Sequence, residues 1–473
     1  MKPLSIQEIK RAISGKQLSA LPAHLPPITS ICTDTRRIEP GSLFIAIKGD
    51  HFDGHDFLPK AAEGGAIAAL VEHAPAEPLP NLHMLEVKDS RRAMGKLATF
   101  VRNQMRSKVI AVAGSNGKTS TKHLIDAALC GKLRGSISPK SYNNDIGVPL
   151  AIFPADPMQD FLVLEMGTNH PGEIKLLSDM AKPDIAVITN CGAEHLEFLG
   201  DLMGVRRENV DIISGLNPKG TLIVNGDDPE LLQAIERFAG QTITFGFGQT
   251  NDLFASDIQC GNTGVHFHLN NSRREVFVPM LGKHNACNAL AALAVARRMG
   301  VSEDMAIETL GQARGPEMRL QKHEIGSITL INDAYNANPN SMRAALETIA
   351  ALSTNGRRIA VLGDMLELGH SSDRYHREIG QVVAQCKFDL LACIGSQGSL
   401  IAEAAEQAGM AIGAICRFRD SVEAAQAIPQ WLQDEDLVLL KGSRSMHLEY
   451  VDGAIKKTRE AIETHQSQAK AAS

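Results

Sequence analysis

Short, continuously apolar segments alternate with helix-like stretches through the middle of the chain, and this alternation restricts the fold most. The apolar segments cover residues 108–113, 161–166, 185–189 and 221–224. Strands that are apolar on both faces belong to a sheet that is covered by helices on both sides. Helical patterns lie between them. The alternation therefore predicts βαβ units and a central sheet that is mostly parallel.

The rest of the 473 residues extends this pattern to three predicted domains. Residues 1–85 hold turns and short strands, and residues 86–312 hold the central alternation. Within the second block, residues 241–280 alternate apolar and polar positions, which predicts a small antiparallel insert. Residues 313–473 repeat the α/β rhythm, with strands expected at 328–332, 358–362, 390–394 and 437–440. We expect an α/β protein whose last domain is Rossmann-like.

Charge and composition exclude several classes of function. The 48 basic and 54 acidic residues give a net charge of −6, which offers no general attraction to nucleic acid or anionic membranes. Aromatic residues make up only 4%, too few for base-stacking platforms. No apolar run approaches the roughly 20 residues of a membrane span. The eight cysteines are scattered without a CxxC pair, so we expect free thiols and a cytoplasmic protein.

The strongest local signal is a glycine-rich loop that follows the strand at 108–113 and opens a helix. Its residues are Gly114, Ser115, Asn116, Gly117, Lys118, Thr119 and Ser120. Backbone N–H groups at such a turn form an anion site, a lysine adds charge at the β/γ-phosphates, and a threonine hydroxyl can reach Mg²⁺. The loop is a shortened variant, because Val112 stands where the longer motif has its first glycine. The alternative is a glycine-rich turn that binds no nucleotide.

Two polar residues follow the next strands of the predicted sheet. Glu165 ends the strand at 161–166, and His195 follows the strand at 185–189. Ligands bind at the carboxyl ends of the strands in open α/β sheets, so Thr119, Glu165 and His195 are expected at one edge. Two more clusters follow strands of the third block, at residues 333–339 and 441–444, and each alone fits an ordinary turn equally well.

Taken together, these motifs resemble the Mur ligases, the ATP-dependent amide-forming enzymes of peptidoglycan precursor synthesis. The matching segments are 114–120, 165–170, 190–197, 285–288, 318–320 and 333–339, and the resemblance covers essentially the whole chain. Segments 143–149, 333–339, 363–369 and 441–444 are most similar to the family members that add D-alanyl-D-alanine to UDP-N-acetylmuramoyl-tripeptide. The resemblance implies three domains, a central P-loop ATPase-like domain among them, and a monomer that uses ATP and Mg²⁺.

The resemblance also implies residue roles. Lys118, Glu165 and His195 would be catalytic, and Thr119, Glu165 and His195 would hold Mg²⁺. Besides the loop, the nucleotide contacts would be Asn285, Asn288, Arg319, Asp333, Tyr335 and Asn336. The first domain would bind the UDP-sugar end of the substrate through Thr35, Arg36, Phe44, Lys48, Gly49, Asp53 and His55. The tripeptide would face Asn143, Asn144 and Asp145, and D-alanyl-D-alanine would lie near Lys441 and Arg444.

One position departs from the family. Many Mur ligases carry a lysine fourteen residues after the metal-binding histidine, often carbamylated so that it helps to bind a second Mg²⁺. Here that position is Asn209, whose amide cannot be carbamylated in this way. The neighbouring Glu208 differs from it by about 100° in direction on a helix, so we expect it to point elsewhere. A locally shifted alignment is the alternative.

Two other functions compete with this interpretation. A folate polyglutamate ligase shares the phosphate loop and the central sheet but begins almost directly at that loop, whereas residues 1–85 of this chain add a domain before it. A nucleotide-gated binding protein without ligase chemistry would have lost lysine or metal-binding residues, and Lys118, Thr119, Glu165 and His195 are all present.

Overall fold

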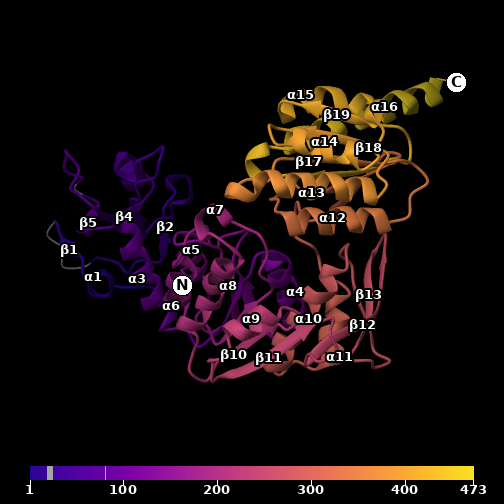
Figure 1. The fold of residues 1–473 in the computed structure, drawn as a ribbon. Helices are drawn as coiled ribbons and strands as arrows, with labels where there is room; N and C mark the ends of the chain where they lie inside the picture. Colours follow the sequence, from indigo (N-terminus) through magenta and orange to yellow (C-terminus); the bar gives the residue numbers. More distant parts are fainter. Residues whose placement is uncertain (19–24, 80, 473) are drawn as a thin grey trace.

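The computed structural model of the chain describes residues 1–18, 25–79 and 81–472. Three sheets follow one another along the chain, each covered by helices (Figure 1). In this view the N-terminal unit lies to the left of the central one, and the C-terminal unit lies above it. The predicted α/β class with three units is confirmed.

The first sheet has five strands in the order β1-β5-β4-β3-β2, and only β1 runs antiparallel to its neighbour. The strands are β1 (Lys16–Gln17), β2 (Ser30–Cys32), β3 (Ser42–Ile45), β4 (Ala66–Val71) and β5 (His83–Glu86). Helices α1 (Ile6–Ile13) and α2 (Leu58–Glu63) belong to the same unit. The predicted boundary at residue 85 therefore falls inside β5.

The central sheet has nine strands in the order β14-β13-β12-β11-β10-β9-β6-β8-β7. The parallel strands include β6 (Lys108–Ala113), β7 (Gly135–Ile137), β8 (Phe161–Glu165), β9 (Ile185–Ile188) and β10 (Thr221–Asn225). Alternate residues of β6 enter two cores: Val109 and Ala111 on one face, Ile110 and Val112 on the other. The strand is apolar throughout because both faces are covered.

Different helices cover the two faces of the central sheet. One face packs against α3 (Ser90–Arg102), α5 (Gly147–Ile152) and α6 (Glu173–Ala181). The other face packs against α4 (Lys118–Cys130), α10 (His284–Arg298) and α11 (Glu303–Leu310). The first core continues into the first domain through α1, since residues of both belong to the same cluster. The first two domains thus share a continuous apolar contact.

The predicted antiparallel insert is only partly correct. The strand β11 (Gln241–Gly246) pairs in parallel with β10, so it extends the parallel sheet. Antiparallel pairing begins between β12 (Leu253–Gly261) and β13 (Gly264–Leu269), and β14 (Glu275–Val278) continues it. β11 lies toward the margin of the parallel region, where its partly exposed alternating residues imitate the pattern of an antiparallel strand.

The C-terminal sheet has the order β15-β16-β20-β17-β18-β19, with only β15 (Gln321–Ile325) antiparallel. The other strands are β16 (Ile328–Asn332), β17 (Arg358–Gly363), β18 (Leu390–Ile394), β19 (Ile415–Phe418) and β20 (Leu437–Lys441). Helices α12 (Pro339–Ala351), α13 (Ser372–Gln385) and α14 (Gly398–Gln407) cover one face. Helices α15 (Ser421–Ala427) and α16 (Glu449–Ala472) cover the other. No helix in the described parts of the chain is both long and apolar enough to cross a bilayer.

Candidate active site

The glycine-rich loop joins β6 to α4 and requires glycine at two positions. Gly114 has φ +127°, and a Cβ there would lie 2.1 Å from Thr189 Oγ1. Gly117 has φ +83°, and a Cβ there would lie 2.6 Å from Asn288 Oδ1. Any larger residue would displace the loop from these neighbours. The loop therefore sits tightly between β9 and α10, with the N-terminus of α4 open to an anion.

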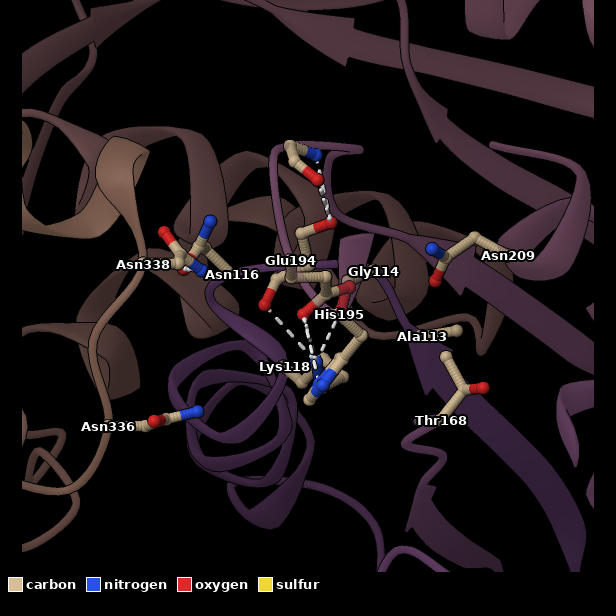
Figure 2. Close-up of polar contacts among 12 residues, drawn as sticks. Ala113, Gly114, Asn116, Lys118, Thr168, Glu194, His195, Asn209, Asn336 and Asn338 are labelled. Atoms are coloured by element: carbon tan, nitrogen blue, oxygen red, sulfur yellow. Dashed lines mark hydrogen bonds and ion pairs between the residues drawn. The ribbon is translucent and has the colours of Figure 1, made fainter. Parts of the chain in front are cut away.

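Lys118 is folded back over this loop (Figure 2). Its ammonium group donates to the carbonyl oxygens of Gly114 and Ser115 and lies 3.8 Å from Glu194 Oε2. Glu194 is buried, and its Oε1 has no hydrogen-bond partner. A buried carboxylate oxygen without a partner is costly, so this atom is free for a cation or a donor.

Glu165, at the end of β8, is a centre of polar contacts. Its carboxylate accepts hydrogen bonds from Thr119 Oγ1 at 3.0 Å and from Asn143 Nδ2 at 3.1 Å. The ammonium of Lys122 lies 3.3 Å from Glu165 Oε2, and both side chains are almost completely buried. Lys122 also donates to the carbonyl oxygens of Ser138 and Lys140. Burial lowers the pKa of Lys122, and the neighbouring carboxylate opposes that shift.

His195 lies at the start of α7 (Leu196–Leu199), between the two larger domains. Its Nδ1 forms a short hydrogen bond with Glu367 of the C-terminal domain. Its Nε2 lies 4.0 Å from Glu194 Oε2, on the side of the phosphate loop. The structure thus brings Thr119, Glu165 and His195 to the same edge of the central sheet, as the strand order predicts.

Two adjoining cavities meet at the phosphate loop. The larger one, about 890 Å³, is lined by residues of all three domains. Among the predicted site residues it contains Ser115, Asn116, Lys118, Asn143, Asn144, Asp145, Glu165, His195, Arg319, Tyr335, Asn336 and Arg444. The smaller cavity, about 280 Å³, lies beside α10 and contains Gly117, Ser120, Asn285, Asn288, Asp333 and Lys441. Asn116, Arg319 and Ser341 border both, so a single elongated ligand could occupy the two together.

The C-terminal domain contributes a buried ion pair and a stacked cation. Lys441 Nζ lies 2.7 Å from Asp333 Oδ2 and donates to the carbonyl of Asn336. The guanidinium of Arg319 lies 4.2 Å from the ring centre of Tyr335. Lys441 is only 2% exposed, so its predicted place beside D-alanyl-D-alanine conflicts with its position against the smaller cavity. Arg444, in contrast, borders the larger cavity.

The predicted substrate residues of the first domain differ in exposure. Arg36 is exposed and pairs with Asp34, which lowers the pKa of Asp34 to about 2. Thr35 is half-buried at the start of the same turn, while Lys48 and Gly49 are exposed. None of the seven residues predicted for this role lines either cavity.

Two of these seven residues have structural contacts that leave them little room to bind a ligand. Phe44 is 1% exposed and packs in the core of the first domain, which argues against a direct side-chain contact with substrate. His55 is buried, with Nδ1 bonded to Asp53 and Nε2 accepting from the backbone amide of Glu72. His73 stacks on it. Although Asp53, His55 and His73 cluster closely, His55 has no free nitrogen for a metal.

Asn209 and Glu208 lie on α8 (Leu202–Val210), and their side chains diverge as helix geometry predicts. Asn209 is buried and donates to the carbonyl of Val205, and no dashed line joins it to His195 or Lys118 in Figure 2. Glu208 accepts from Thr168 Oγ1 and from the amides of Gly172 and Ile174, so it caps the N-terminus of α6. The carboxylate of Glu208 is therefore engaged in hydrogen bonds at the N-terminus of α6.

Sequence reasoning missed three charged residues of this site: Lys122, Glu194 and Glu367. Lys122 stands four residues after Lys118 on α4, a spacing that places both on one helix face. Glu194 directly precedes His195 and was a visible signal. Glu367 comes from the other domain, and only the packing of the two domains brings it to His195.

Three family models match successive parts of the chain. The one described as the Mur ligase family, catalytic domain, matches residues 27–102, the Mur ligase middle domain matches 112–296, and the glutamate ligase domain of Mur ligases matches 318–444. UDP-N-acetylmuramoyl-tripeptide–D-alanyl-D-alanine ligase of Bacillus subtilis is 38% identical over 90% of this chain and 92% of its own. The enzyme of the same name from Escherichia coli is 34% identical over 91% and 94%.

Solved structures give the same result. A crystal structure of MurF from Acinetobacter baumannii superposes with a TM-score of 0.87 at 31% identity, covering 97% of this chain and 99% of that one. MurF ligase from Thermotoga maritima, solved in complex with ADP, has a TM-score of 0.81 at 27% identity, covering 92% and 98%.

Proposed function

The chain belongs to the Mur ligase family, and we propose that it joins D-alanyl-D-alanine to UDP-N-acetylmuramoyl-tripeptide at the expense of ATP, in peptidoglycan precursor synthesis. One observation carries this function furthest. The phosphate loop, Glu165 and His195 of the central domain face Arg319 and Tyr335 of the C-terminal domain across one cavity. A ligase that binds ATP together with the two substrates it joins needs such a space between domains.

The reaction has two steps in this proposal. The terminal carboxylate of the tripeptide attacks the γ-phosphorus of ATP, the bond from that phosphorus to the bridging oxygen breaks, and ADP leaves as the acyl phosphate forms. The neutral amine of D-alanyl-D-alanine then attacks the acyl carbon, inorganic phosphate leaves, and the amine loses a proton. Because two anions meet in the first step, charge neutralisation dominates its barrier.

The residues of this chain fit these demands. Lys118 would exchange its contacts with loop carbonyls for the phosphates, and the N-terminus of α4 would hold the same anion. The adenosine would occupy the smaller cavity beside Asn285 and Asn288. Closure of the C-terminal domain would exclude water from the acyl phosphate. Hydrolysis of that intermediate would consume ATP without forming the amide bond.

The donor set fits Mg²⁺, which prefers hard oxygen ligands. Glu165 and Thr119 offer a carboxylate and a hydroxyl, and the unpartnered Oε1 of Glu194 is an oxygen that lacks a cation. His195 offers Nε2 beside them. Bound there, Mg²⁺ would neutralise phosphate charge.

The first domain is proposed to bind the UDP end of the peptide substrate. Replacing Arg36 with alanine is expected to raise the KM for UDP-N-acetylmuramoyl-tripeptide about tenfold, as loss of a phosphate contact does, with the KM for ATP unchanged. Steady-state phosphate release measures both. Arg92→Ala is a matched control, because Arg92 is an exposed arginine that pairs with its neighbour Asp89. A raised KM for ATP instead would place Arg36 at the nucleotide.

Asn209 leads to a second prediction. Activity is expected to be insensitive to removal of bicarbonate, because the Asn209 amide nitrogen already donates to Val205 and forms no carbamate with CO₂. The assay is phosphate release in CO₂-free buffer with and without added bicarbonate, with the Mg²⁺ dependence of Asn209→Lys measured beside it. A loss of wild-type activity that bicarbonate reverses would contradict this prediction.

The proposed reaction itself is tested by substrate dependence. Phosphate release is expected only when ATP, UDP-N-acetylmuramoyl-tripeptide and D-alanyl-D-alanine are all present, with the joined pentapeptide product detected by mass spectrometry. Release that depends on a folate and glutamate would support the polyglutamate ligase instead. Nucleotide binding without any release under these conditions would support a binding protein.

A further inference from the structure

A loop of the C-terminal domain docks directly on the turn that carries His195. The backbone amide of Glu197 donates to the carbonyl of Glu367 at 3.2 Å, and the Glu367 carboxylate bonds to His195 Nδ1. Gly369 packs so closely that a Cβ there would lie 3.3 Å from Glu197 Cα. Glu367 and His195 have φ values of +61° and +48°, which are uncommon for residues other than glycine. The contact is therefore specific in both backbone and side chain.

The hydrogen bond between His195 and Glu367 determines which nitrogen of the imidazole ring carries the proton. An ionised carboxylate can only accept hydrogen bonds, so Nδ1 carries the proton that it shares with Glu367. In a neutral ring the lone pair is then on Nε2. Since Nε2 lies 4.0 Å from Glu194 Oε2, which is 3.8 Å from Lys118, that lone pair faces the phosphate loop. A histidine that binds a metal depends on such a partner at its other nitrogen.

We propose that Glu367 is a positioning residue, which orients His195 for the cation at the phosphate loop only when the C-terminal domain is docked. Glu367 lies on the C-terminal domain, whereas His195 follows a strand of the central sheet, so opening the domains separates the pair. The cation site is thereby complete only in the closed enzyme. This inference rests on the proposed function, because it assigns Glu367 a role in that same site.

Other contacts hold the two domains together without Glu367. Asn338 donates to the Asn116 side chain at 2.8 Å (Figure 2), and the amide of Ala193 donates to Asn340 at 3.3 Å. Loss of the Glu367 carboxylate should therefore leave docking possible and change chiefly the orientation of His195. A variant of Glu367 that still docks its domain but binds the cation more weakly would therefore show a positioning role and not a purely structural one.

The test measures cation binding without turnover. Mn²⁺ binding to the full-length enzyme with ADP is followed by the electron paramagnetic resonance signal of free Mn²⁺. Glu367→Ala is expected to weaken Mn²⁺ binding about 10–100-fold, the usual effect of removing the partner of a metal-binding histidine. Glu367→Gln, which can still accept from Nδ1, should lose less. Glu406→Ala, an exposed glutamate of α14, is the matched control and should bind Mn²⁺ as the wild type does.

A double-mutant cycle shows whether the effect passes through His195. His195→Gln/Glu367→Ala is expected to bind Mn²⁺ no more weakly than His195→Gln alone, whereas independent roles would add. Unchanged Mn²⁺ binding in Glu367→Ala would overturn the inference, as would additive losses or a raised KM for D-alanyl-D-alanine as the only effect. These binding measurements use neither peptide substrate, so they stand even if the proposed reaction is not observed.

Discussion

Replacing Lys118 with alanine is expected to lower phosphate release by at least about a thousandfold, which is the scale of losing a preorganised charge at a transition state. The contacts of the Lys118 ammonium are polar ones, with two loop carbonyls and Glu194. Its lost charge would therefore slow the attack of one anion on another and leave the fold intact. Steady-state turnover and thermal unfolding of the same preparation measure the two effects.

Lys96→Ala is the control for this experiment. Lys96 is an exposed lysine of α3 and should be replaceable with little change in turnover or unfolding temperature. Near-normal phosphate release from well-folded Lys118→Ala would refute the assignment of residues 114–120 as the phosphate loop. Loss of folding in Lys118→Ala would instead give the lysine a structural role toward Glu194.

The sequence predicted those parts of the site that depend on strand order. Thr119, Glu165 and His195 each follow a buried parallel strand, and the carboxyl ends of such strands meet at one edge whatever the loops do. The bounds of β6 were predicted correctly because its buried apolar residues lie between the exposed Lys108 and the glycine-rich loop. The apolar pattern of the sequence and the three-dimensional position of a residue agree where the same sheet determines both.

The features that the sequence did not predict depend on contacts between distant segments. Lys441 is the last residue of β20, but the burial that pairs it with Asp333 depends on the loop between β16 and α12. The family resemblance predicts Phe44 as a binding residue, yet its strand is buried on both faces. Glu367 and His195 are 172 residues apart, and only domain docking places them together. The spacing of apolar and polar residues within one segment does not predict a contact with a distant segment.

The buried pair of Lys122 and Glu165 leads to the largest expected loss of stability. Replacing Lys122 with methionine keeps most of the side-chain length and removes the charge, so Glu165 remains buried without its cation. Breaking a buried pair in this way costs about 3–5 kcal/mol of the free energy of unfolding. Turnover is expected to fall as well, because the ammonium group that contacts the Glu165 carboxylate at 3.3 Å would be missing from the site.

The double variant Lys122→Met/Glu165→Gln separates stability from activity. With both charges gone, no uncompensated ion remains, so its unfolding temperature in scanning calorimetry should lie above that of Lys122→Met alone. Its turnover should stay low, because the carboxylate that faces Thr119 is missing. Lys132→Met, at an exposed lysine just past the end of α4, should leave both quantities unchanged. If Lys122→Met unfolds like the wild type while turnover falls, Lys122 acts on the reaction and contributes little to the stability of the central domain.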